Sequence, residues 1–182
     1  MSDAARLRAV VSKEPVVSGL LERLHTLNLP QAYIGAGAIT QTVWNHLTGQ
    51  PLGAHRKDID VVYFDPDDLT EAGEARVLAA LVDAAGGVPL DVVNQARVHL
   101  WFPEHFGVTI PPFRSTAEAI ATWPTPASAV GLSLDGICAP LGLSDLWGLI
   151  ARPNRGLVSE AAYTAKVTRW QKNWPELTVI PW

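Results

Sequence analysis

The sequence predicts an α/β or α+β domain built around a small mixed β-sheet with helices packed against it. Short apolar runs rich in β-branched and aromatic residues alternate with longer stretches in which apolar residues recur every three or four positions, so strands and helices interleave. Of the 182 residues, 48% are hydrophobic and 18% charged. This balance is globular, and the length suits one domain with a substantial core. We expect that domain to span residues 1–182, with a helical C-terminal part from about residue 142.

The first elements are a helix, a strand and a second helix. We expect a helix over residues 15–28, because Pro15 suits a first helical turn and apolar residues follow in one stripe. A short strand over residues 32–34 then runs into the turn Gly35–Ala38. The next helix stacks Ile39, Val43 and Leu47, and it ends at a loop over residues 50–53.

The middle of the chain predicts two further strands with a helix between them. Residues 58–64 form the first strand, and the acid-rich turn Asp65–Asp68 leads into a helix over about residues 70–85. The expected core face of that helix consists of Val77, Leu78, Leu81 and Val82. Residues 89–93 form the second strand, and the polar–apolar alternation of residues 97–102 predicts that it continues or bends there.

Shorter elements follow. Ser115 is a predicted helix N-cap, because its hydroxyl can accept from early backbone N–H groups. Residues 127–139 are expected to be extended, as a hairpin around residues 134–136, and a short helix opens at Ser144. The last helix covers about residues 159–172 and buries Tyr163, Val167 and Trp170.

Composition excludes several classes of function. The net charge of −4 gives no support for a large nonspecific nucleic-acid surface, which is normally basic. The single cysteine, Cys138, excludes an internal disulfide framework and a cysteine-based zinc site. The N-terminus lacks the apolar stretch of a signal peptide, and no apolar run approaches the roughly 18 residues of a membrane span. We therefore expect a cytoplasmic protein that does not enter a membrane.

Two carboxylates stand one residue apart in the strand at residues 58–64. Side chains alternate along a strand, so Asp58 and Asp60 point to the same side with Cα atoms roughly 7 Å apart. Adjacent anionic groups repel each other, and Mg²⁺ or Mn²⁺ between them relieves the repulsion because hard cations prefer carboxylate oxygens. The alternative is a pair of solvated acids, and this tripeptide alone does not decide between the two.

Other features near these acids suit phosphoryl transfer. Gly37 allows close approach of a triphosphate to the backbone, and the helix that follows offers free N–H groups at its positive end. Asp91, on a strand expected about 4.8 Å away, can complete a metal shell and draw a proton from an attacking hydroxyl. Such a site works by positioning and charge neutralisation and needs no activated serine, cysteine or histidine.

This order of turn, Asp-x-Asp strand and later acid resembles the DNA-polymerase-β-type nucleotidyltransferase superfamily. The chain is most similar to a bacterial group of nucleotidyltransferase family proteins, over about residues 30–180. The matching segments are residues 36–45, 58–65, 90–101, 139–146, 152–154 and 166–170. Two departures are Ala38, where the superfamily has glycine or serine, and an insertion over residues 48–57.

The resemblance implies an α+β fold with a small mixed sheet flanked by helices. It implies transfer of a nucleoside monophosphate from an NTP to a hydroxyl or phosphate acceptor, with Mg²⁺ or Mn²⁺ as cofactor and release of pyrophosphate. The implied catalytic residues and metal ligands are Asp58, Asp60 and Asp91. By the same analogy the turn that contains Gly35, Gly37 and Ala38 holds phosphates.

Basic residues supply weaker candidates. Arg97 and His99 lie two apart on a predicted strand, so both can face the triphosphate, although structural roles are the competing interpretation. Arg56, Lys57, Arg97 and Lys166 can form a local positive cleft. For Lys166 with Arg169, an exposed polar helix face is favoured.

Rival functions fit less well. An aspartyl-phosphate phosphatase needs its acid at the other end of the strand, a dinucleotide site lacks its third glycine at Thr40, and a glycosyltransferase does not explain the glycine turn. The serious alternative is a catalytically inactive nucleotide-binding or regulatory module on the same fold. A toxin that modifies RNA or protein is a third possibility. The NTP, the acceptor and the oligomeric state are not predicted.

Overall fold

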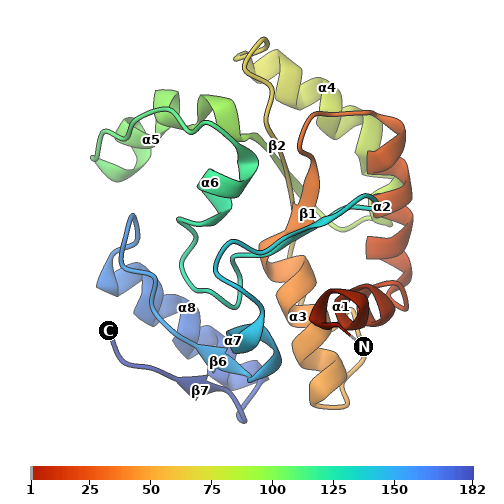
Figure 1. Cartoon of the computed structure of the whole chain (residues 1–182), viewed down its shortest axis with the longest axis vertical. Coiled ribbons are helices and arrows are strands. Elements are labelled where there is room, and N and C mark those ends of the chain that lie inside the picture. The colour runs from red at the N-terminus through yellow and green to blue at the C-terminus, as the bar shows by residue number, and fades with distance from the viewer. Residues whose placement is uncertain (1) are drawn as a thin grey trace.

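A five-stranded mixed sheet lies at the centre of the computed structural model, which describes residues 2–182 (Figure 1). The strand order is β3-β2-β1-β4-β5. The strands are β1 (Tyr33–Gly35), β2 (Ile59–Tyr63), β3 (Leu90–Asn94), β4 (Gly131–Leu132) and β5 (Ile137–Cys138). β2 pairs parallel with β3, while the β1–β2, β1–β4 and β4–β5 pairs are antiparallel. The prediction of a small mixed sheet is confirmed, as is the hairpin around residues 134–136.

One face of the sheet packs against the helices of the N-terminal half. These are α1 (Asp3–Val11), α2 (Pro15–Thr26), α3 (Ala36–Leu47) and α4 (Glu71–Leu81), which continues as the 3₁₀-helix η1 (Val82–Ala85). Alternation along the strands directs one set of apolar side chains into the main core: Ile34, Ile59, Val61, Tyr63 and Val92. We call this the back face.

The opposite face, which we call the front face, is covered by later parts of the chain. The 3₁₀-helix η2 (Gln95–Arg97) leads into α5 (Val98–Phe106), and α6 (Thr116–Ile120) follows. In Figure 1, α5, α6 and α8 (Glu160–Asn173) lie across the sheet from α2 and α4. Val62 points to this side and packs in a small cluster with Ile120, Ala129 and Cys138. The front face is therefore less completely filled than the back.

The C-terminal segments dock onto α3. They comprise α7 (Ser144–Trp147), α8, and a parallel pair formed by β6 (Ile150–Ala151) and β7 (Thr178–Val179). The ring of Trp44 lies 5.1 Å from that of Trp170 and 5.4 Å from that of Trp174, both edge-on. Trp174 Nε1 donates to Asn45 Oδ1 at 2.9 Å. Trp170 is buried as predicted, and these three buried tryptophans hold α8 in place.

The prediction of extended chain over residues 97–102 is wrong, because this segment is the start of α5. Asn94 ends β3, and its side chain accepts from the N–H of Ala96, which turns the chain into η2. Gly107, with φ +70°, then closes α5. The alternating residues Val98, Leu100 and Phe102 do not share one face of the helix, since Val98 is buried and Leu100 is 54% exposed.

Two further predictions about helices need correction. In α4, Val77 and Leu81 are buried as expected, but Leu78 is 37% exposed and Val82 50% exposed. The helix ends at Leu81, and the change to η1 directs Val82 away from the core. Helix α1, which buries Leu7, Val10 and Val11, was not predicted. Within residues 2–182, none of the helices has the length and apolar character that a bilayer span requires.

Candidate functional site

The predicted acids meet on the front face of the sheet. Asp60 in β2 is paired directly with Asp91 in β3 and with Gly35 in β1. Directly paired residues of neighbouring strands project to the same side, and Asp58 lies two residues before Asp60. Asp58 and Asp91 are exposed, and Asp60 is half-buried between them. The structure thus brings Asp58, Asp60 and Asp91 together on the side that α8 faces.

The acids act on one another through their charges. Burial raises the pKa of Asp60 to about 6, and the negative charges of Asp58 and Asp91 add to the rise. Lys166 and a backbone hydrogen bond from Gly37 lower the same pKa in part. Burial also raises the pKa of Asp91, and the negative charge of Asp58 raises it further by a smaller amount. The site carries more negative charge than its surroundings neutralise.

The carboxylates suit a hard cation by their chemistry. Carboxylate oxygens are the ligands that Mg²⁺ and Mn²⁺ prefer, and a cation would offset the burial and, secondarily, the repulsion from Asp58 and Asp91 that raise the pKa of Asp60. With the side chains as they stand, residues 2–182 contain no group of three or more His, Cys, Asp or Glu side chains gathered closely enough to hold one ion. The chemistry of these carboxylates thus fits a divalent cation, but their side chains do not form a closed coordination site in this conformation; the residues that would hold the ion are Asp58, Asp60 and Asp91.

The turn between β1 and α3 lies beside Asp60. Ala36 has a φ of +47°, a left-handed conformation that costs free energy for a residue with a side chain, and its N–H donates to the carbonyl of Val130 at 3.0 Å. Ala38 is fully buried, so its methyl group belongs to the core and offers no surface to a ligand. The N–H of Ala36 is thus bonded to Val130 and that of Gly37 to Asp60, and the remaining early N–H groups and the positive end of α3 lie in the same turn.

The two glycines of this turn have different reasons to be glycine. A Cβ at Gly35 would lie 2.7 Å from Cη2 of Trp123 and 3.2 Å from the carbonyl oxygen of Val130, so packing excludes a side chain. A Cβ at Gly37 would approach only the flexible amide of Gln41, at 3.0 Å. The fold alone does not require glycine at position 37.

Lys166 is a site residue that sequence reasoning assigned to an exposed helix face. It lies on α8 and borders the same cleft as Asp60, whereas Arg169 is exposed as expected. Burial lowers the pKa of Lys166, while the charges of Asp60 and Asp58 raise it. Its ammonium is 5.2 Å from the ring centroid of Trp170. The sequence did contain a sign of this position: Lys166 lies three residues after Tyr163 and four before Trp170, at the edge of the buried stripe of the helix.

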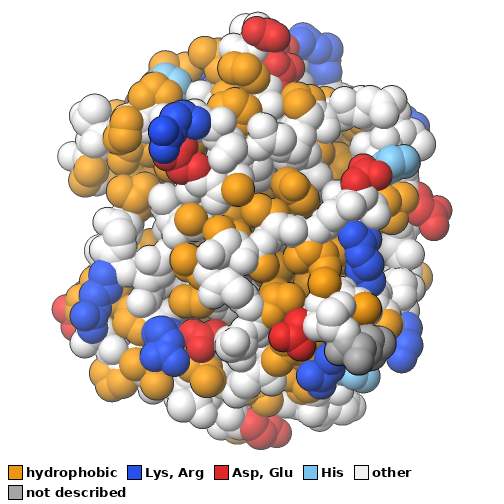
Figure 2. All heavy atoms as spheres, in the orientation of Figure 1, with side chains coloured by type: hydrophobic (Ala, Val, Ile, Leu, Met, Phe, Trp, Pro, Cys, Tyr) orange, Lys and Arg blue, Asp and Glu red, His pale blue; other side chains and the backbone are white. Residues whose placement is uncertain are grey.

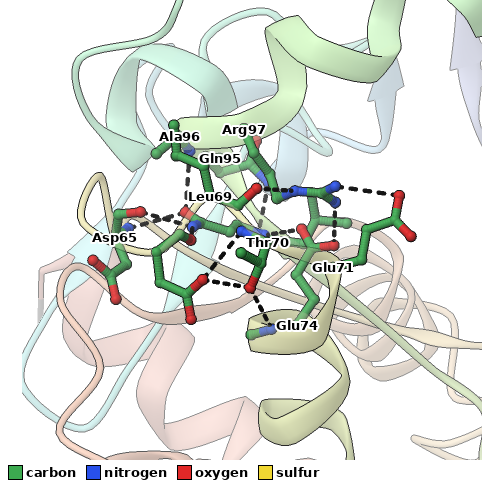
Figure 3. A network of polar contacts seen from close by, with 12 residues as sticks. Asp65, Leu69, Thr70, Glu71, Glu74, Gln95, Ala96 and Arg97 are labelled. Carbon is green, nitrogen blue, oxygen red and sulfur yellow. Dashed lines mark hydrogen bonds and ion pairs between the residues drawn. The ribbon is translucent and has the colours of Figure 1, made fainter.

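Arg97 is engaged away from the acids. Its Nη1 donates to Glu74 at 2.5 Å, its Nη2 approaches Glu71 at 3.4 Å, and its Nε donates to the carbonyl of Leu69 at 3.3 Å (Figure 3). Arg97 is only 8% exposed. This network ties η2 to α4 and gives Arg97 a structural role.

His99 lies on α5, not on a strand. Residues two apart on a helix point in different directions, so the geometry that placed Arg97 and His99 on one face is wrong. The Nδ1 atom of His99 is buried, and no hydrogen-bond partner for it is found in the described part of the chain. Neither residue is among those that line the cleft beside Asp60.

A cleft of about 670 Å³ opens from Asp60 and Lys166 along the front face. Val62 and Val93 form its floor, and α5, α6 and the segment that enters α8 form its walls. Figure 2 shows hydrophobic side chains gathered over α5 and across the centre of this view. A second hollow of about 310 Å³ lies between α2 and the β4–β5 hairpin and contains none of the predicted site residues.

Both the sequence and the fold have counterparts among known proteins. Residues 22–179 match the family model described as "Nucleotidyltransferase". An NMR structure described as revealing a CCA-adding enzyme head domain superimposes with a TM-score of 0.77, covering 99% of this chain and 97% of that one at 22% identity. No match is found among curated proteins. The expected α+β fold, with its small mixed sheet flanked by helices, is confirmed.

Proposed function

This chain belongs to the nucleotidyltransferase family, and from that premise we propose that it transfers a nucleoside monophosphate from an NTP to a hydroxyl or phosphate acceptor, using Mg²⁺ or Mn²⁺ and releasing pyrophosphate. The observation that carries this proposal is the row of Asp58, Asp60 and Asp91 beside the N-terminus of α3. A catalyst of phosphoryl transfer needs anionic metal ligands next to donors for phosphate oxygens. This face of the sheet supplies both.

Asp58, Asp60 and Asp91 would hold the cation. When bound, the cation neutralises charge on the triphosphate and makes the α-phosphorus more electrophilic. Its positive charge also favours the ionised form of Asp60, whose pKa of about 6 lies close to neutrality in the metal-free protein. The acids then act as fixed ligands that position the phosphates.

Two groups bind the triphosphate from opposite sides. N–H groups in the first turn of α3 would donate to phosphate oxygens, and Gly37 lets those oxygens approach the backbone. Lys166 adds a positive charge from α8, across from the acids. Because the α3 turn and α8 face each other, the reacting phosphate is enclosed between sheet and helix.

Asp91 is the proposed general base. It is exposed, so an acceptor hydroxyl can reach it, and it neighbours Asp60 across the β2–β3 pair. Burial and, secondarily, the charge of Asp58 raise the pKa of Asp91, so its carboxylate is a stronger base than that of a free aspartate. The acceptor oxygen attacks the α-phosphorus as its proton passes to Asp91.

The first prediction is that Asp91→Asn keeps NTP binding and loses turnover. The amide preserves shape but takes no proton, so we expect turnover to fall about 100-fold or more, with NTP affinity changed less than about threefold. The measurement combines calorimetric titration of each Mg²⁺–NTP with a search for labelled product, using α-labelled NTPs and cell extract as a source of acceptors.

The exposed acid Asp83 on η1 provides a matched control, because Asp83→Asn removes the same charge away from the site. This variant should retain both binding and turnover. Turnover that survives in Asp91→Asn would eliminate the base role. The inactive-module alternative predicts a different pattern, in which the wild type binds NTP but yields no product with any extract.

A further inference from the structure

The cleft beside Asp60 changes character along its length. Asp60 and Lys166 stand at one end and are the charged residues among the side chains that line it. From there the cleft continues over Val62 and Val93 toward aromatic side chains of α5. It is therefore a site with a reactive polar end and an apolar body.

Aromatic rings form the walls of the apolar body. Phe102 and Phe106 pack with ring centroids 4.5 Å apart, and Trp101 lies 6.1 Å from Phe102. Phe113 and Trp123 also line the cleft. Phe106 is 61% exposed although it is a large apolar residue, which leaves its ring available to a ligand. Flat rings pack favourably on such surfaces.

Three of the uncharged polar side chains that line the cleft make hydrogen bonds within the protein. Gln95 Nε2 donates to the carbonyl of Val93 at 3.4 Å, and the hydroxyl of Thr122 donates to the carbonyl of Ala119 at 2.7 Å. The Ser159 hydroxyl accepts from the N–H of Ala162 at 3.2 Å as the N-cap of α8. A nucleobase or a sugar would bury several polar atoms here without matching partners, which costs free energy. An apolar ligand incurs no such cost.

We propose that this cleft binds the acceptor, and that the acceptor is an alcohol or phenol that carries a flat apolar ring. This inference rests on the proposed nucleotidyl transfer. The ring lies among Phe102, Phe106 and Trp123, and the hydroxyl lies at the Asp60 end. The hydroxyl oxygen forms a bond to the α-phosphorus, the bond from that phosphorus to the bridging oxygen breaks, and pyrophosphate leaves. The hydroxyl proton passes to Asp91, and the product is a nucleoside monophosphate ester of the alcohol.

Two substitutions change the cleft without touching the acids. Ala162→Phe adds a ring from an exposed position of α8 that lines the cleft, and Phe106→Ala removes part of the α5 wall. Leu100→Ala is the matched control, since Leu100 is 54% exposed on the same helix and does not line the cleft. Each position is exposed, so the variants should fold, and circular dichroism verifies this.

The test measures two ligands separately. Ligand-observed NMR titration follows 2-naphthalenemethanol as the apolar alcohol, and calorimetry follows Mg²⁺–ATP. We expect Ala162→Phe and Phe106→Ala to weaken binding of the alcohol at least tenfold, while Leu100→Ala changes it less than twofold. Affinity for Mg²⁺–ATP should stay within twofold in all three. With the NTP that turns over, label should pass to 2-naphthalenemethanol and not to glycerol.

Contrary outcomes separate this inference from the proposed function. Absence of alcohol binding, or binding that neither substitution affects, overturns the assignment of the cleft. A loss of Mg²⁺–ATP affinity in Ala162→Phe also overturns it, because the cleft then holds the nucleoside. If the wild type binds the alcohol but no Mg²⁺–NTP, the nucleotidyl transfer itself is contradicted, and the acceptor role falls with it.

Discussion

Asp60 is the residue at which burial and charge act most strongly on the site. Its folded-state pKa of about 6 exceeds the ordinary value of 3.8, so the folded protein binds this proton more tightly than the unfolded chain does. The stabilising effect of the protonated carboxyl is complete below about pH 4 and is lost as pH rises through 6. Ionised Asp60 then costs up to about 3 kcal/mol of folding free energy.

Asp60→Asn should therefore stabilise the metal-free protein while destroying its activity. At pH 8 we expect the free energy of unfolding to rise by about 1–3 kcal/mol, since the uncharged amide avoids both desolvation and repulsion. Urea denaturation in EDTA at pH 4, 6 and 8 measures the effect. The gain should be smallest at pH 4, and equal shifts at every pH would contradict the origin in charge.

Single residues of the site differ in how far the sequence could place them. Asp58 and Asp60 follow from the two-residue repeat of a strand, which needs no knowledge of the rest of the fold. Lys166 reaches the acids only because α8 docks on α3, a long-range contact that local periodicity does not encode. For Arg97, the decisive fact was its pairing with Glu74 of α4, 23 residues away in sequence.

At the scale of an element, the β1–α3 turn combines two kinds of constraint. Gly35 is enclosed by Trp123 and by backbone, whereas Gly37 has only the Gln41 side chain beside it. Ala36 between them is held in a left-handed conformation by its bond to Val130. Strain of this kind is typical of sites whose backbone is shaped for a ligand.

Substitution of each glycine by alanine should separate these constraints. Gly35→Ala should destabilise the protein by about 1–3 kcal/mol, because the new methyl overlaps Trp123. Gly37→Ala should leave stability unchanged or raise it by up to about 1 kcal/mol in the first turn of a helix. It should also weaken NTP binding about tenfold, because the methyl displaces phosphate from the backbone. Thermal denaturation and NTP titration measure both, and a stable Gly35→Ala would contradict the packing argument.

Helices and strands could be predicted from the sequence where a single periodicity of apolar residues dominated. The stripes in α2, α3 and α8, and the strand β2, emerged at nearly their observed bounds. Helix α5 was misassigned because its apolar residues follow one another closely, and because the cap that starts it comes from Asn94, at the end of the preceding strand. The pattern of apolar residues does not reveal a side-chain hydrogen bond that joins the end of a strand to the start of a helix.

At the scale of the whole molecule, a buried ion pair connects the N-terminal helices with the approach to the site. Arg56 Nη2 lies 3.1 Å from Glu14 Oε2, with side chains 4% and 6% exposed. Glu14 also caps α2 by accepting from the N–H of Val17 at 2.7 Å. Arg56 belongs to the predicted insertion over residues 48–57, which the side chain of Asn45 anchors through the carbonyls of Leu52 and Ala54.

Removal of Arg56 should leave the Glu14 charge buried without its partner. We expect Arg56→Met to lower the free energy of unfolding by about 3–5 kcal/mol. The double variant Arg56→Met with Glu14→Gln should recover part of this loss, because the amide can still accept from Val17. Urea denaturation of the two single variants and the double variant completes a cycle. Additive losses would show that the pair is not coupled.

Lys166, the positive charge that α8 brings to the site, follows the three aspartates by a long stretch of sequence. A ribosome releases the three aspartates and the glycine turn before Lys166 and Trp170 of α8 emerge. Until then the nascent polypeptide presents an acidic sheet with no opposing cation from α8. The proposed nucleotide site is therefore completed only after α8 has been synthesised.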